Sequence, residues 1–342
     1  MKKLLTLILL LPTVLWAQNA EEVQNLVAKG VRMHDKGLYP EAIAWYQEAL
    51  ALDSTSGLIY YELAFTYFAM EEYEKAIAAS KKVLELDDRY GLEATNNIGN
   101  SLDMLGRSQE AVDVFKKGIK TYGEDARLYF NMGITLMHME RLYEGLSAFE
   151  QALLTSPVHA SSAYNLASYH LEQGEMGKGV LAGYYFLLLE PTGDRAEHVY
   201  DLLMKSLAGE FDVEGDQVTV YIDPNAMEEE FGMVNMLVAA TSMAQRNLDE
   251  LGESDYFQST TDKIFATVWE SKKRRDKGLY WELLAPLFYS LSQSEYMDAF
   301  CAYIRVGNDE EAIKWVKANN RQVEEMAVFA QSEIERVQAE MK

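Results

Sequence analysis

The stretch ARLYFNMGITLMHMERLYEGLSAFEQALLTSP, residues 126–157, contains two amphipathic runs of helical period separated by a short polar turn. Gly133 is followed twelve positions later by a second small residue, Gly145, and four residues after that by Phe149. Pro157 closes the stretch. Small residues let two helices approach closely, and a bulky residue fills the space beside them. This stretch therefore predicts a helical hairpin.

The same arrangement recurs along the chain with a period of about 34 residues. Ala64 and Gly99 take the place of Gly133, and Tyr46 and Phe115 take the place of Phe149. The period is regular except for one extra residue in the segment 87–91. The five copies start near Val23, Gly57, Leu92, Ala126 and Ala160.

One such hairpin cannot bury its own apolar face, whereas a row of hairpins can bury a continuous core. The order of residue types, W-x2-L-G-x2-Y, then A-x3-F, then P, resembles the tetratricopeptide repeat family. The resemblance covers about half of the chain, residues 18–192, and implies an all-α solenoid of about five repeats.

The amino-terminal residues have the pattern of a secretory signal. Met1-Lys2-Lys3 is a positively charged start, and residues 4–16 form an apolar run that is too short to span a bilayer. Small Ala17 then suits a cleavage site, so we expect residues 1–17 to be removed and the mature chain to begin at Gln18. The expected location is the periplasm, reached through the inner membrane.

The composition limits the partners. A net charge of −23 argues against nucleic-acid backbones and anionic membrane surfaces. The single cysteine, Cys301, cannot form an internal disulfide, and its apolar helical surroundings predict a buried structural thiol. The five histidines are dispersed and show no metal-ligand spacing, and no phosphate-binding or nucleophile motif occurs. We therefore expect no cofactor, no metal and no catalytic residues.

Residues 193–342 lack the repeat register and predict a helical domain with at most one short strand, Val218–Ile222. Pro286 should kink or restart the helix that contains it, and the segment 307–310 reads as a helix stop followed by a cap. Residues 180–189 are apolar almost all round, which indicates that the C-terminal region packs directly on this helix. The predicted helices are 195–210, 226–251, 256–275, 280–292, 295–306 and 308–340.

In tetratricopeptide arrays the first helix of each hairpin lines a concave groove, and the resemblance places a set of residues there. Aromatic rings beside amides suit an extended peptide or a docked helix, because rings bury area and amides bind backbone groups. The alternative is that several of these groove residues pack against the C-terminal region of the chain. The basic clamp that some members use for a peptide carboxylate is not expected, since Asn96, Phe130 and Tyr164 occupy its positions. The predicted groove residues are Tyr61, Phe65, Phe68, Asn96, Asn100, Phe130, Met137 and Tyr164.

These observations favour a non-enzymatic scaffold or adaptor of the cell envelope that binds a protein or peptide partner in the groove. The alternative is a small-ligand receptor or enzyme with a pocket between the array and the C-terminal domain. Its motivation is an aromatic concentration around Pro286, formed by Trp269, Tyr280, Trp281, Tyr289 and Tyr296. A third reading is a homo-oligomer that associates through the apolar fifth copy and the C-terminal helices.

Overall fold

A computed structural model of the chain describes residues 20–86, 88–208, 212–214, 217–219, 231–237 and 253–341. The predicted signal segment, residues 1–17, lies outside these residues. The predicted helix over 226–251 lies outside them too, except for 231–237, of which 232–237 are helical. The chain divides into two compact units, Met1–Gly145 and Leu146–Lys342. The predicted boundary after residue 192 falls inside the second unit, so the limits of the domains stay a prediction.

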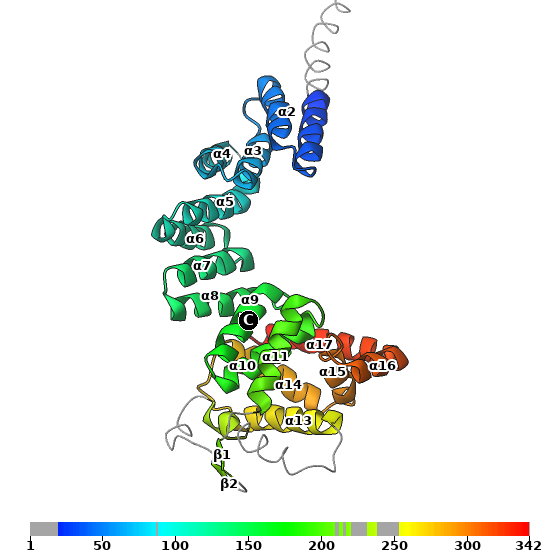
Figure 1. Cartoon of the computed structure of the whole chain (residues 1–342). Coiled ribbons are helices and arrows are strands. Elements are labelled where there is room, and N and C mark those ends of the chain that lie inside the picture. Colours follow the sequence, from blue (N-terminus) through cyan, green and yellow to red (C-terminus); the bar gives the residue numbers. More distant parts are fainter. Residues whose placement is uncertain are drawn as a thin grey trace, which may run out of the picture. The chain divides into compact units, whose positions relative to one another are not determined.

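The first unit is a succession of helical hairpins, as the repeat predicts (Figure 1). Within it, α3 packs on α4, α4 on α5, α5 on α6 and α6 on α7. Its elements are a helix over residues 20–34, α2 (Tyr39–Leu52), α3 (Gly57–Ala69), α4 (Tyr73–Leu86), η1 (Asp88–Tyr90), α5 (Gly91–Met104), α6 (Ser108–Tyr122), α7 (Ala126–His138) and the start of α8 (Leu142–Thr155). The extra residue of the segment 87–91 coincides with the 3₁₀ turn η1, which joins two repeats.

In two of these hairpins, the two helices pack through a close contact between a glycine and an aromatic ring. A Cβ atom built on Gly30 would lie 2.3 Å from the ring of Tyr46, and one built on Gly99 would lie 2.4 Å from the ring of Phe115. Both rings are fully buried. Only a residue without a Cβ fits under either ring, which explains why small and bulky residues recur sixteen positions apart.

The second unit contains the fifth hairpin and the C-terminal helices. In addition to the rest of α8, its elements are α9 (Ala160–Glu172), α10 (Met176–Leu189), α11 (Asp194–Ala208), β1 (Asp212–Glu214), β2 (Gln217–Thr219), a helix over 232–237, α13 (Glu253–Ser271), the π-helix η3 (Leu279–Leu284), α14 (Ala285–Ser292), α15 (Met297–Tyr303), α16 (Glu310–Ala318) and α17 (Asn320–Met341). Among the residues that the structure describes, no helix combines the length and the apolar character needed to cross a membrane.

Helix α10 is covered on several sides, which confirms the prediction from its apolar sequence. It packs on α9, on α11 and on η3. The ring of Tyr184 contacts Phe265 and Phe288, with centroid separations of 5.3 and 6.3 Å. Its hydroxyl lies 2.8 Å from the Thr261 hydroxyl, and burial raises the pKa of the Tyr184 phenol well above its usual value. The C-terminal helices therefore pack directly on the last hairpin.

Three predictions for the C-terminal region need correction. The region contains two strands, not at most one, because β1 pairs antiparallel with β2, with Val213 opposite Val218. The predicted helix over 308–340 is two helices, separated at Asn319, whose side chain donates to the Trp315 carbonyl at the end of α16. The predicted helix over 256–275 is shorter at its end, because α13 stops at Ser271 and the basic residues 272–275 follow it.

Two other predictions for this region are confirmed. The helix containing Pro286 restarts, because the π-helix η3 gives way to α14 and the proline occupies its first turn. The cap before α16 is also present, since the Asp309 carboxylate accepts from the backbone N–H groups of Glu311 and Ala312.

We expect Gly99→Ala to destabilise the first unit, because the new methyl group would overlap the buried Phe115 ring. Overpacking of this kind typically costs about 1–3 kcal/mol. Gly183→Ala is the matched control in a helix interior. A Cβ there would meet nothing closer than 3.4 Å, so alanine should be neutral or stabilising by up to about 1 kcal/mol. Thermal unfolding of both variants measures the difference, and equal midpoints would contradict the close-contact explanation.

Candidate functional site

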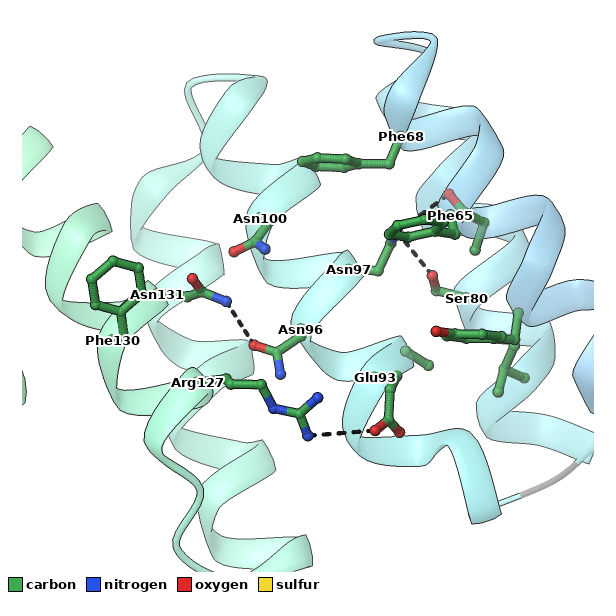
Figure 2. Close-up of a pocket in the computed structure, with 14 residues that line it drawn as sticks. Phe65, Phe68, Ser80, Glu93, Asn96, Asn97, Asn100, Arg127, Phe130 and Asn131 are labelled. Carbon is green, nitrogen blue, oxygen red and sulfur yellow. Dashed lines mark hydrogen bonds and ion pairs between the residues drawn. The ribbon is translucent and has the colours of Figure 1, made fainter. Parts of the chain in front are cut away.

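A cavity of about 380 Å³ opens in the first unit, along the helices α3, α5 and α7 (Figure 2). Phe65 and Phe68 approach it from α3, Phe130 approaches it from α7, and the asparagines of α5 lie between them. Its volume falls in the range typical of ligand sites, about 300–1,000 Å³. The lining residues are Tyr61, Ala64, Phe65, Phe68, Ser80, Val83, Glu93, Ala94, Asn96, Asn97, Asn100, Arg127, Phe130 and Asn131.

Six of the eight predicted groove residues line this cavity: Tyr61, Phe65, Phe68, Asn96, Asn100 and Phe130. The other two do not. Met137 lies half-buried beside Gly145, where its sulfur would be 2.8 Å from a Cβ atom on that glycine.

Tyr164 belongs to the second unit and packs there on its neighbours. Its ring lies 5.4 Å from that of Phe186, and the Arg195 guanidinium sits 5.3 Å above it. The Tyr164 ring thus packs against residues of α10 and α11, which the repeat register alone could not indicate.

The floor of the cavity consists of residues that sequence reasoning did not select. Ala64, Ser80, Val83 and Ala94 line it and are almost fully buried. Ser80 lies sixteen residues after Ala64, at the repeat position that holds Tyr46 in the first copy and Phe115 in the third. The sequence therefore does indicate this part of the cavity, because a small hydroxyl residue stands at a repeat position that holds an aromatic ring in other copies.

A hydrogen-bonded asparagine joins the second and third copies beneath the cavity. The Nδ2 of Asn97 donates to the Ala64 carbonyl at 3.3 Å, and its Oδ1 accepts from the Ser80 hydroxyl at 3.1 Å (Figure 2). A second amide contact joins the third and fourth copies, where Asn131 Nδ2 donates to Asn96 Oδ1 at 2.9 Å. Asn100 has no hydrogen bond to another described side chain, so its amide is available to a bound group.

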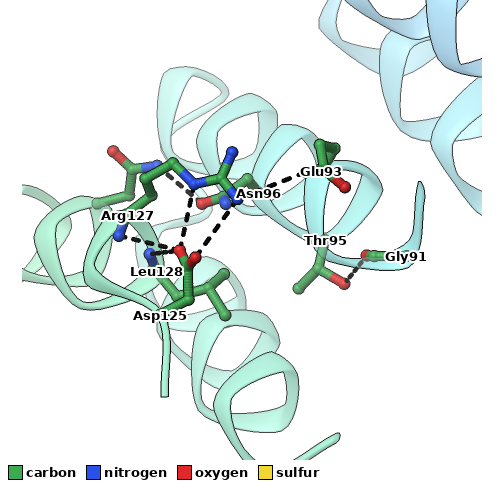
Figure 3. A network of polar contacts seen from close by, with 8 residues as sticks. Gly91, Glu93, Thr95, Asn96, Asp125, Arg127 and Leu128 are labelled. Carbon is green, nitrogen blue, oxygen red and sulfur yellow. Dashed lines mark hydrogen bonds and ion pairs between the residues drawn. The ribbon is translucent and has the colours of Figure 1, made fainter. Parts of the chain in front are cut away.

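The charges at the cavity are paired with each other (Figure 3). Arg127 lies 3.4 Å from Glu93 of the preceding copy and also bonds Asp125, at 3.3 Å. Asp125 caps α7 by accepting from the backbone N–H groups of Arg127 and Leu128. Tyr61 stacks on Tyr90 with a centroid separation of 5.2 Å, and burial together with the neighbouring Glu62 carboxylate raises the pKa of its phenol. The charged residues that line the cavity are therefore one acid and one base, Glu93 and Arg127, which pair with each other.

Two rings of the aromatic concentration near Pro286 are packed core. Trp281 and Tyr280 are 1% and 3% exposed, and Trp281 stacks on Phe231 at 4.6 Å. Trp269 likewise stacks on Tyr289, at 4.9 Å. Trp269 is itself 36% exposed, and Tyr296 lines a surface hollow together with Val328 and Phe329.

Cys301 is buried as predicted, at 2% exposure, and burial raises the pKa of its thiol to about 12. A thiol held in its neutral form is a poor nucleophile. Among the described residues, no group of three or more His, Cys, Asp or Glu side chains is arranged to hold a metal ion.

Three family models match the chain. One, described as a TPR repeat, covers residues 30–71, and two described as tetratricopeptide repeats cover residues 55–124 and 130–185.

Two curated proteins are similar over part of their length. A Hordeum vulgare protein described as probable UDP-N-acetylglucosamine–peptide N-acetylglucosaminyltransferase SPINDLY is 22% identical over 153 residues, which are 43% of this chain and 16% of that protein. The small glutamine-rich tetratricopeptide repeat-containing protein 2 of Mycosarcoma maydis is 26% identical over 103 residues, 30% of this chain and 29% of that protein. The chain thus spans less than a third of the length of either relative. Among solved structures, Pseudomonas aeruginosa PilF matches 74% of this chain and 97% of its own at 18% identity, with a TM-score of 0.44.

The hydrogen bonds separate structural asparagines from available ones, and this can be tested. Asn97→Ala leaves the buried Ser80 hydroxyl without this acceptor and removes a contact between copies. A loss of about 1–3 kcal/mol is expected. Asn100→Ala, one helical turn away, should stay within about 0.5 kcal/mol of the wild type. Urea unfolding followed by circular dichroism measures both, and a comparable loss for Asn100→Ala would show that this amide is structural as well.

Proposed function

Because residues 30–124 and 130–185 of this chain match tetratricopeptide repeat models, we propose that it is a non-enzymatic scaffold that binds a segment of a partner protein. The observation that carries the proposal is the cavity along α3, α5 and α7. Its exposed rings can bury apolar side chains, and its amides can bond the polar backbone of an extended chain. A net charge of −23 disfavours nucleic acid as the occupant.

The cavity suits a peptide better than a reacting small molecule. It offers aromatic carbon and amide groups, and its one acid and one base are paired with each other. The aromatic cluster that motivated the enzyme alternative is used in packing within the second unit. We therefore assign the partner-binding role to the first unit.

Three exposed or half-exposed rings provide the test of this role. We expect the combined change of Tyr61, Phe65 and Phe130 to alanine to weaken binding of peptides selected from a random display library against the wild-type protein. Aromatic anchors at interface centres each contribute about 2 kcal/mol or more, so the loss should exceed about 100-fold. Isothermal titration of the selected peptides measures it, while circular dichroism checks that the helices persist.

Tyr143→Ala is the matched control, because this ring is 85% exposed and does not line the cavity. Its affinity for the same peptides should equal that of the wild type. Peptides that bind the triple variant as tightly as the wild type would remove the cavity as the binding site, and failure to select any peptide would overturn the proposed function.

We also propose that the protein acts in the bacterial cell envelope. The support is the amino-terminal pattern, a positive start followed by an apolar run and Ala17. Amino-terminal sequencing of the protein from fractionated cells should find Gln18 as the first residue in the periplasmic fraction. Recovery of the chain in the cytosol with Met1 in place would contradict this location.

A further inference from the structure

The second repeat departs from the glycine-and-ring contact that holds its neighbours together. In the first and third copies a glycine lies against a buried ring, Gly30 against Tyr46 and Gly99 against Phe115. In the second copy the corresponding residues are Ala64 and Ser80. Neither supplies a ring, and both line the floor of the cavity together with Val83.

The alanine and the serine at these two positions of the second copy are sterically compatible with each other. A Cβ at Gly99 would lie 2.4 Å from the Phe115 ring, so an alanine at this position is compatible only with a small partner sixteen residues later. Ser80 is such a partner, and its hydroxyl is satisfied by the Asn97 side chain at 3.1 Å. The second hairpin is therefore built without its ring, and the two small residues that replace the glycine-and-ring pair line the cavity.

The charge of the lining indicates what can fill this space. Among the described residues, Glu93 and Arg127 are the only charged ones that line the cavity, and they form an ion pair at 3.4 Å, although the whole chain carries −23. A charged side chain entering the cavity would lose part of its water shell, and the acid and base of the lining are already paired with each other, so this cost is poorly compensated. A neutral apolar side chain loses nothing comparable and gains the burial of its carbon surface.

The size of the cavity sets the second condition. A cavity of about 150 Å³ is enough to hold benzene. About 380 Å³ accommodates one large side chain together with part of the backbone that carries it. Asn100, whose amide is unused by the described side chains, lies where it can bond such a backbone (Figure 2).

We propose that the cavity is a selective pocket for one bulky, uncharged apolar side chain, such as leucine, methionine or phenylalanine, and that the Ala64–Ser80 pair determines its size. That the side chain belongs to a partner protein rests on the proposed function; the pocket itself rests on the geometry of the second and third copies. Ser80 acts as a specificity-determining residue because the ring it replaces would occupy the pocket.

The pocket can be tested without a known partner. The probes are N-acetyl methylamides of leucine, alanine, aspartate and lysine, added to the full protein and followed through the methyl NMR signals of Ala64, Val83 and Ala94. The leucine probe should shift these signals with a dissociation constant on the order of 1 mM, in keeping with its few atoms. The alanine probe should bind at least about tenfold more weakly, because it buries three fewer carbons. The aspartate and lysine probes should leave the signals unchanged.

The double variant Ala64→Gly/Ser80→Phe reproduces the glycine-and-ring pair of the third copy and should fill the floor. We expect this variant to fold and to bind the leucine probe at least about tenfold more weakly than the wild type does. The comparison of leucine with alanine in the wild-type protein needs no variant, so the proposal remains testable if the double variant does not fold. Equal binding of the two probes, preferential binding of a charged probe, or unchanged leucine binding by the folded double variant would each overturn the pocket.

The two proposals fail in different ways. If library peptides bind the wild type and are lost in the triple-alanine variant, but the leucine probe does not shift the floor methyls, the partner-binding role stands and the selective pocket is wrong. If the leucine probe binds and no peptide is selected, the pocket stands and the partner-binding role is wrong. Selected peptides should share a large apolar residue, and its change to alanine should weaken their binding to the protein by at least about tenfold.

Discussion

The first unit depends on how closely the two helices of a hairpin can approach. Gly99 and Phe115 show the constraint, because the ring occupies the space of the missing Cβ. Such a contact excludes water and fixes the register of one helix against the other, since neither residue can move along its helix without a clash or a void. Repetition of this contact at Gly30 and Tyr46 gives the first and third hairpins the same geometry. The helices of successive copies can then share one continuous core.

The fifth copy satisfies this constraint differently. Gly183 occupies the repeat position that holds an aromatic ring in other copies. A Cβ atom built on it would lie at ordinary contact distances from Leu171, Val199 and Leu203. Leucine and valine side chains from α9 and α11 thus occupy the space that a ring fills elsewhere. The sequence of α10 is correspondingly apolar on all sides, and Tyr184 extends its packing to the rings of α13 and α14. A departure from the repeat pattern marks the place where the array becomes part of a larger core.

Features that depend on period and composition are predicted well from the sequence. Helical hairpins, the buried Cys301 and the cover over α10 all depend on spacing or on apolar character along one element. The position of Tyr164 was not predictable in this way, because Arg195 and Phe186 reach it from elements outside the repeat register. The break at Asn319 was missed because helical period continues on both sides of it. The partner strand β1 was missed because three residues, Asp212–Glu214, are too few to show an alternating pattern.

The candidate site shows why a repeat pattern identifies a groove more readily than a pocket. Register places Phe65, Asn96 and Phe130 on the lining, since these positions face the same side in every copy. The floor depends instead on a residue that fails to follow the pattern. Ser80 provides a hydroxyl where the neighbouring copies have rings, and Asn97 satisfies it with an amide that also joins two copies. The same hydrogen bond therefore stabilises the array and compensates for the missing ring, so an opening can exist in the stack without an unsatisfied polar group beneath it.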